Sequence, residues 1–155
     1  MSPGLNFEII SRAELPANGK ISAEQSRPVV LVVDDERVIA DTLSIILKQS
    51  GFSALTAYDG ESALELAAVV PPQLLLSDVM LGPGINGAEL AIAITKSCPD
   101  CKVLLFSGHA ATRDLLDSVG AAGNKFTLLN KPLHPADLLA RIQESFPVTR
   151  LSTVT

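Results

Sequence analysis

The chain has 155 residues, a hydrophobic content of 47% and a mean hydropathy of +0.34, which is enough for one domain with a single core. No apolar run approaches the roughly 20 residues of a membrane-spanning helix, and a formal net charge of −5 without a basic cluster argues against membranes and duplex DNA as direct partners. The first 27 residues lack the basic and apolar regions of a secretory signal, so we expect a cytoplasmic location.

Residues 1–27 combine proline, glycine and asparagine with scattered charges and show no sustained hydrophobic periodicity. Such a stretch is typical of an extension or a linker. From Pro28 the pattern becomes regular, because apolar runs alternate five times with longer stretches of helical spacing. This alternation predicts an α/β domain with a parallel sheet covered by helices. We expect this domain over 28–146, followed by a C-terminal tail over 147–155.

The apolar runs predict five strands, over residues 29–33, 53–57, 73–77, 102–106 and 126–129. Helical spacing predicts helices over residues 36–49, 60–69, 88–97 and 112–119, and a last helix that begins near Pro135. The first strand is apolar at every position, as expected where helices cover both faces of a sheet. The second strand has a weaker pattern, which favours a place nearer an edge.

Two of the predicted helices have a clear apolar face. The first has a stripe made of Ile39, Leu43, Ile46 and Leu47. The last has a face made of Leu138, Leu139, Ile142 and Phe146. Gly51 supplies the left-handed residue that ends the first helix, and Pro71 and Pro72 end the second.

Cys98 and Cys101 form a single C-x-x-C pair, and neither His109 nor His134 stands at ligand spacing from it. A structural zinc site is therefore not expected. The pair follows a predicted helix, whereas a redox pair would be expected at a helix N-terminus, where the thiolate is stabilised. We therefore expect no redox function.

Four of the apolar runs end on residues that could jointly hold a divalent metal and a phosphoryl group. These residues are Asp34 and Asp35 after the first strand, Asp78 after the third, Ser107 after the fourth and Lys131 after the fifth. The carboxyl ends of the strands in an open parallel sheet lie along one edge, so these side chains can converge on one site. Neighbouring carboxylates repel unless a cation offsets their charge, and Mg²⁺ prefers such oxygen ligands.

Each of these residues also has an ordinary structural interpretation. Asp34 and Asp35 could simply cap the helix that follows them. Asp78 alone could be a turn aspartate, and Ser107 alone a loop serine. A lysine before Pro132 is common, although a cis peptide at this proline would fix the direction of the lysine side chain. The combination therefore carries more weight than any member.

The order of acidic pair, single aspartate, serine and Lys-Pro resembles the receiver domain of two-component response regulators over residues 28–146. The motifs that carry the resemblance are VLVVDDE, LLLSDVML, GINGAEL, VLLFSGH and NKPLHPADLL. The resemblance implies a flavodoxin-like, doubly wound (βα)5 fold with a five-stranded parallel sheet in the order 2-1-3-4-5.

The resemblance also implies a Mg²⁺ site beside a phosphoacceptor. Asp78 would accept a phosphoryl group from a phosphohistidine on a sensor kinase or a phosphotransfer protein. Asp35, Asp78 and the backbone carbonyl of Met80 would bind Mg²⁺, and Asp34 would hold a water molecule of the ion.

Lys131 and Ser107 would contact the phosphoryl oxygens and begin the switch. Receivers usually carry Phe or Tyr three residues before this lysine, but here the position is Leu128. Phe126 points to the same side of a strand, since side chains alternate. The sequence therefore does not assign the step in which an aromatic ring would swing inward as the serine hydroxyl moves.

The signal would pass to a protein partner through the surface made by residues 112–119, the last strand and the last helix, and a homodimer is compatible with the same surface. The domain would be no enzyme beyond its own phosphotransfer and dephosphorylation. Only nine residues follow Phe146, so we expect a stand-alone receiver or a fragment of a longer one, and Met1 favours the former.

Parts of the same pattern are also found in proteins with three other functions. A degenerate receiver would dock to partners without phosphorylation, but the full set of site residues argues against it. A Mg²⁺-dependent phosphohydrolase would need a general acid near Asp78, which Met80 cannot provide. Flavin or nucleotide binding would need a glycine-rich phosphate loop after the first strand.

Overall fold

The computed structural model describes residues 27–108, 126–131 and 134–146 of the chain. The strands are β1 (Val29–Val33), β2 (Ser53–Ala57), β3 (Leu74–Asp78), β4 (Lys102–Ser107) and β5 (Thr127–Asn130). The helices in these ranges are α2 (Arg37–Gln49), α3 (Gly60–Val69), α4 (Gly87–Ser97) and α6 (Pro135–Glu144). The helix predicted over 112–119 lies outside the described residues.

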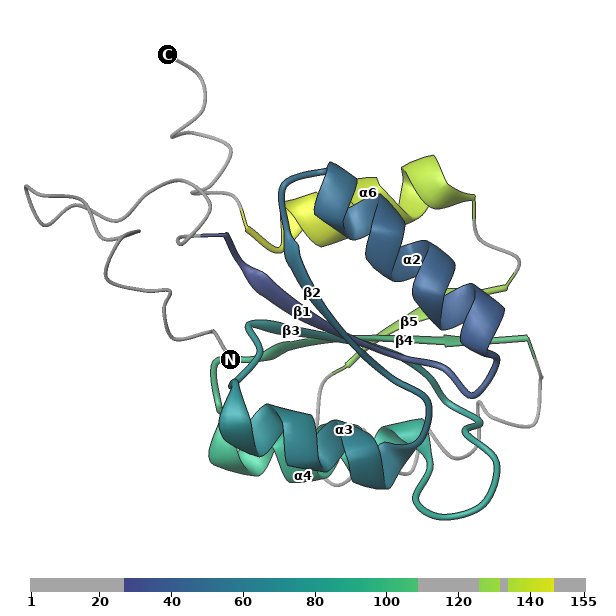
Figure 1. Ribbon diagram of the computed structural model, residues 1–155, viewed down its shortest axis with the longest axis vertical. Coiled ribbons are helices and arrows are strands. Elements are labelled where there is room, and N and C mark those ends of the chain that lie inside the picture. Colours follow the sequence, from purple (N-terminus) through teal and green to yellow (C-terminus); the bar gives the residue numbers. More distant parts are fainter. Residues whose placement is uncertain (1–26, 109–125, 132–133, 147–155) are drawn as a thin grey trace, which may run out of the picture.

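All five strands are parallel and form one sheet in the order β2-β1-β3-β4-β5. The predicted fold class and strand order are therefore confirmed, and β2 does lie at an edge. Figure 1 shows the sheet between two helical layers, with α2 and α6 on one face and α3 and α4 on the other.

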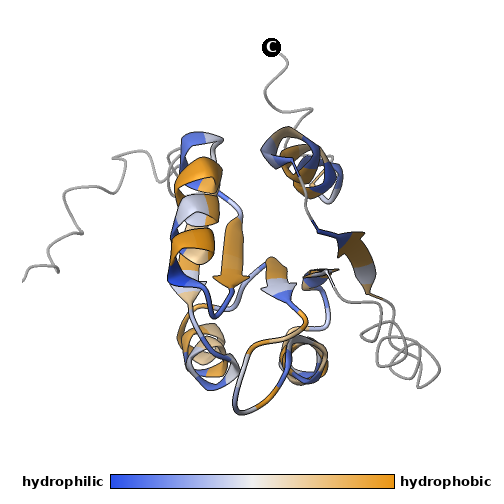
Figure 2. Ribbon diagram, turned by 90° about the vertical axis from the view of Figure 1, so that its right-hand side faces the viewer, coloured by the Kyte–Doolittle hydropathy of each residue, from blue (hydrophilic) through white to orange (hydrophobic). Residues whose placement is uncertain are grey.

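Each face of the sheet has its own hydrophobic cluster, because the side chains of a strand alternate between the two faces. In β1, Leu31 and Val33 belong to the cluster under α3 and α4, whereas Val30 and Val32 belong to the cluster under α2 and α6. The helices carry hydrophobic and hydrophilic residues together, while the strands between them are mainly hydrophobic (Figure 2). Because apolar side chains fill both faces of the sheet, buried polar groups are expected at the ends of the strands.

Several element boundaries differ by one residue from the predicted ones. β3, β4 and β5 continue to Asp78, Ser107 and Asn130 because the ladders still pair Asp78 with Phe106 and Ser107 with Asn130. Polar residues thus extend strands whose ends were predicted one residue earlier.

Two helix starts also differ. Glu36 has extended backbone angles and stands before the first turn of α2 rather than in it. α4 begins at Gly87, one residue before the prediction, where the side chain of Asn86 accepts a hydrogen bond from the amide of Glu89 at 2.8 Å. Such a cap satisfies an amide that has no partner within the helix.

The predicted helix faces and helix ends are found. All four stripe residues of α2 are buried or half-buried, and Gly51 has a φ of +100° after the end of that helix. In α6, Leu138 and Ile142 are buried, while Leu139, together with Phe146 just beyond the helix, packs at the edge of the same cluster. Among the helices of the described ranges, none has both the length and the apolarity to cross a membrane.

Candidate functional site

The carboxyl edge of the sheet brings together the ends of β1, β3, β4 and β5. Asp34 follows β1 directly, and its amide donates to the carbonyl of Ala57 at the end of β2 at 3.3 Å. Asp78 is the last residue of β3, Ser107 is the last of β4, and Lys131 follows β5. The strand register therefore brings side chains that are almost a hundred positions apart in the chain to one edge of the sheet.

Three carboxylates meet at this edge. Asp34, Asp35 and Asp78 each offer an oxygen atom, and these atoms all lie within 4.8 Å of one another. Asp34 and Asp78 are buried, whereas Asp35 is exposed at the mouth of the site. The strand ends converge as predicted.

Asp34 is fully buried, and its Oδ2 has no hydrogen-bond partner among the described residues. Burial raises the pKa of Asp34 to about 6, and the negative charges of Asp78 and Asp35 act in the same direction. A hydrogen bond from the amide of Glu36 at 2.9 Å and the positive charge of Lys131 oppose this rise. A proton or a cation is therefore needed to offset the charge of this carboxyl group.

Lys131 supplies a positive charge. Its Nζ lies 2.9 Å from Oδ2 of Asp78 and 3.9 Å from Oδ2 of Asp34. Burial lowers the pKa of Lys131, but the hydrogen bond to Asp78 and the surrounding negative charges outweigh burial, so the pKa is raised. The ammonium group also lies 5.1 Å from the ring centroid of Phe106, which is a favourable cation–π distance.

One lysine cannot neutralise three carboxylates. A buried oxygen without a hydrogen bond, together with a set of carboxylates at close range, fits a hard divalent cation that takes oxygen ligands. The residues present therefore suit Mg²⁺, and Asp34, Asp35 and Asp78 are the side chains that would hold it.

Both carboxylate oxygens of Asp78 have protein donors. Lys131 donates to Oδ2, and the amide of Met80 donates to Oδ1 at 3.2 Å. The backbone on either side is also held, since the amide of Val79 donates to the carbonyl of Phe106 at 3.0 Å and Ser77 Oγ donates to the carbonyl of Asp78 at 2.8 Å. The orientation of the Asp78 side chain is therefore fixed by one donor on each carboxylate oxygen.

Ser107 is 5% exposed and adjoins this site through the backbone. Its carbonyl accepts a hydrogen bond from the amide of Lys131 at 3.0 Å. The backbone of Ser107 is therefore linked directly to the backbone of the lysine that contacts Asp78.

Leu128 and Phe126 both pack against the cluster under α3 and α4, so the two side chains do point to the same side. Met80, whose carbonyl was assigned to the metal, has a half-exposed side chain. Pro132 and His109 lie outside the described residues.

Two contacts were not predicted from the sequence. Phe106 ends the strand predicted over 102–106, and the structure places its ring 5.1 Å from the ammonium group of Lys131. Glu61, in the first turn of α3, accepts a hydrogen bond from the amide of Ile85 at 3.2 Å. No sequence signal links residues 24 positions apart in different elements, so only the tertiary structure reveals this contact.

The cysteine pair lies away from this edge. Both cysteines are free thiols, and burial, followed by the neighbouring Cys98, raises the pKa of Cys101 to about 12. A raised pKa disfavours the thiolate, which is the reactive form.

Known proteins resemble the chain in sequence. Residues 30–143 match the family described as response regulator receiver domain. The chain is 32% identical over 125 residues to the probable transcriptional regulatory protein TcrX of Mycobacterium tuberculosis, which covers 81% of this chain and 52% of TcrX. It is 29% identical over 117 residues to the DNA-binding response regulator MtrA of Mycolicibacterium smegmatis, covering 76% of this chain and 50% of MtrA. The chain thus spans about half the length of these curated relatives.

Solved structures resemble the chain in fold. A CheY-like receiver domain protein from Methanospirillum hungatei has a TM-score of 0.70 and 28% identity, covering 82% of this chain and 99% of its own. The chemotaxis response regulator CheY4 of Vibrio cholerae has a TM-score of 0.68 and 27% identity, covering 78% and 100%. Since the sequence match runs from β1 to α6 and these neighbours share the fold over nearly their whole length, the chain belongs to the response regulator receiver domains of two-component systems.

Proposed function

We propose that Asp78 accepts a phosphoryl group from a phosphohistidine on a sensor kinase or a histidine phosphotransfer protein. The observation that carries this proposal is the contact of 2.9 Å between Lys131 Nζ and Asp78 Oδ2, within a group of three carboxylates that lie within 4.8 Å of one another. Phosphorylation and Mg²⁺ binding are general features of receiver domains, so the family supports the same assignment.

In this reaction a carboxylate oxygen of Asp78 forms a bond to phosphorus, and the bond from phosphorus to the donor imidazole nitrogen breaks. The electron pair of that bond returns to the imidazole, which takes up a proton. Lys131 already touches the attacking carboxylate, so its charge can follow the phosphoryl oxygens as the bond forms. The buried hydroxyl of Ser107 is the proposed second contact to those oxygens.

Mg²⁺ would supply positive charge that offsets the negative charge of the phosphoryl group. We assign its protein ligands to Asp35, Asp78 and the carbonyl of Met80, with Asp34 acting through a water molecule. The orphaned Oδ2 of Asp34 supports this assignment, because a buried acceptor of this kind needs a donor or a cation.

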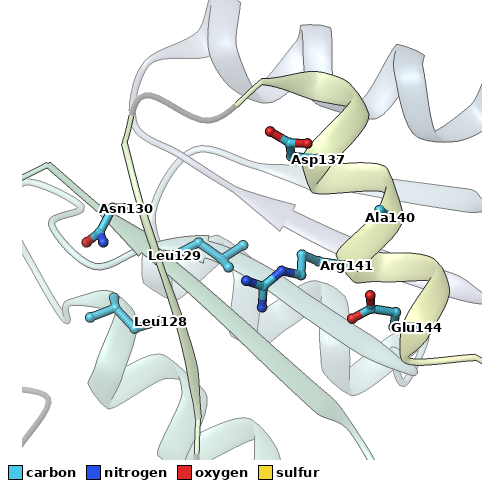
Figure 3. Close-up of a pocket in the computed structure, with 7 residues that line it drawn as sticks. All are labelled: Leu128, Leu129, Asn130, Asp137, Ala140, Arg141 and Glu144. Atoms are coloured by element: carbon cyan, nitrogen blue, oxygen red, sulfur yellow. The ribbon is translucent and has the colours of Figure 1, made fainter.

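We propose a protein, rather than DNA or a membrane, as the target of the signal from this domain. The surface involved includes β5 and α6, between which a pocket opens. Figure 3 shows Arg141 reaching from α6 toward β5 in that pocket. The lining residues are Leu128, Leu129, Asn130, Asp137, Ala140, Arg141 and Glu144. A mixed lining of leucines and charged groups suits a protein surface, and a second copy of the chain is compatible with it.

The test is the intact mass of the chain after incubation with acetyl phosphate and Mg²⁺. We expect a gain of about 80 Da, the mass of one phosphoryl group, that disappears with EDTA and in Asp78→Asn, because the amide cannot form the acyl phosphate. Far-UV circular dichroism should be the same for both proteins, since the amide keeps the shape of the carboxylate.

Equal labelling of the wild type and Asp78→Asn would refute the acceptor assignment. A wild type that neither gains mass nor binds beryllofluoride would instead favour a domain that docks to partners without phosphorylation.

A further inference from the structure

The loop that follows Asp78 is held near its C-terminal end by a side chain from a helix that does not adjoin it. This loop, which we call the acceptor loop, covers residues 79–86 between β3 and α4. Within it, Ile85 donates its amide hydrogen to Oε2 of Glu61 at 3.2 Å. Glu61 lies in the first turn of α3. Asn86, at the end of the loop, also donates its amide to Oε1 of Glu89 at 2.9 Å, but Glu89 lies in α4, the helix that the loop enters. Glu61 instead belongs to α3, which does not adjoin the loop in the chain.

The contact with Glu61 is close because glycines border it. A Cβ built on Gly84, which has a φ of +93°, would lie only 2.7 Å from the carboxylate oxygens of Glu61. A Cβ on Gly60 would overlap the side chain of Ile85. The loop therefore rests directly on the N-terminal turn of α3, with a polar contact at Glu61 and an apolar one at Gly60.

The other end of the acceptor loop rests on the acidic site. The amide of Met80 donates to Asp78 Oδ1, and a Cβ on Gly82 would lie 3.4 Å from Oδ2 of Asp35. Gly87, directly after the loop, passes so close to the carbonyl of Asp78 that a Cβ there would overlap it. The segment between Met80 and Ile85 thus spans the distance from the proposed metal ligands to Glu61.

We propose that Glu61 is a positioning residue for the Mg²⁺ site. By holding the amide of Ile85, it keeps the acceptor loop in the shape that sets Met80 and Gly82 against Asp78 and Asp35. Loss of this acceptor frees the end of the loop at Ile85, so the site must order the loop each time the ion binds. The inference rests on the proposed function, because it assumes that the three carboxylates hold Mg²⁺.

The conservative variant separates a positioning role from an electrostatic one. Glu61→Gln keeps a side-chain oxygen that can accept from Ile85 but removes the negative charge, whereas Glu61→Ala removes both. Glu65→Ala is the matched control, because Glu65 is exposed one turn further along α3 and makes no hydrogen bond to the acceptor loop among the described residues.

The experiment measures the Mg²⁺ dissociation constant of the full chain by calorimetry, together with amide hydrogen exchange of Met80 in the absence of metal. For Glu61→Ala we expect a dissociation constant about three- to tenfold higher, the size of one lost hydrogen bond, and faster exchange at Met80. Glu61→Gln and Glu65→Ala should stay within about twofold of the wild type.

Three outcomes would overturn the inference. If Glu61→Ala matches the wild type in both readouts, Ile85 is held well enough by its side chain on Gly60. If Glu61→Gln behaves like Glu61→Ala, the charge and not the hydrogen bond is responsible. If the wild type binds neither Mg²⁺ nor beryllofluoride, the proposed function fails as well, which distinguishes that failure from the first two.

Discussion

At the scale of single residues, the unusual group is Asp34, a carboxyl group without exposed surface whose pKa is raised to about 6 from an ordinary value of 3.8. A raised pKa means that the folded protein holds this proton at a pH where the unfolded chain has released it. The contribution to stability is therefore complete below about pH 4 and is lost as the pH rises through about 6. Above that pH, the metal-free protein carries a buried charge that costs free energy.

Asp34→Asn should therefore stabilise the metal-free protein at pH 7, by about 2 to 3 kcal/mol. The gain should be small near pH 4 and should vanish at lower pH, where the carboxyl group is protonated in both states. Urea unfolding followed by circular dichroism at pH 4, 5, 6 and 7 in EDTA measures this difference. The same variant should bind Mg²⁺ more weakly than the wild type, and a loss of stability at pH 7 would contradict the account of the buried charge.

At the scale of elements, the turn from β3 into α4 depends on a glycine. The amide of Gly87 donates to the carbonyl of Val79 at 2.8 Å, and a Cβ at Gly87 would overlap the carbonyl oxygen of Asp78. Gly87→Ala must therefore move the backbone, and we expect it to destabilise the protein by about 2 to 4 kcal/mol.

Gly51→Ala is the matched comparison for Gly87→Ala. Gly51 has a φ of +100° but open space around it, so an alanine there meets only backbone strain of about 1 to 2 kcal/mol. The urea midpoints of both variants show whether Gly87→Ala loses more stability than Gly51→Ala. Equal losses would mean that the backbone next to Asp78 can give way easily.

Strand β5 carries the position where the family usually has an aromatic ring. Leu128 packs against the cluster under α3 and α4 and also lines the pocket beside α6. A tyrosine there would change the surface offered to a partner while leaving Asp78 and Lys131 in place. Leu128→Tyr should therefore change the affinity for a protein partner more than the rate of phosphorylation by acetyl phosphate. A large change in that rate with unchanged binding would contradict this division.

At the scale of the whole molecule, the strand order decides how much each strand contributes to the free energy of unfolding. Leu31 of β1 pairs with Leu75 of β3 on one side and with Leu55 of β2 on the other. Leu75 is fully buried in the middle of the sheet, whereas Leu55 is half-buried at its edge. The same leucine-to-alanine change should therefore cost about 3 to 5 kcal/mol at Leu75 and about 1 kcal/mol at Leu55.

Urea unfolding of Leu75→Ala and Leu55→Ala tests this difference in burial between the central and the edge strand. Similar losses for the two variants would mean that β2 is covered by something beyond the described residues.

Much of the fold was predictable because its signals are local. The apolar run of β1, the stripe of α2 and the stop at Gly51 are each read from neighbouring residues, and each is found in the structure. The strand ends were predicted one residue short at Asp78 and Ser107, since a polar residue can still pair in a ladder when the adjacent strand extends beside it. The helix predicted over 112–119 and the boundaries of the two terminal segments stay predictions.

By itself, the sequence determined the kind of fold, the strand order through its family resemblance, and the set of polar residues at the strand ends. The hydrophobic period and the local composition are properties of a few neighbouring residues, so they can be recognised in the sequence alone. Only the tertiary structure decided that Asp34 is fully buried with an orphaned oxygen, that Lys131 touches Asp78, and that Glu61 holds the acceptor loop. These features depend on the packing of segments far apart in the chain, because burial and a contact between two atoms are properties of the folded arrangement and not of either residue.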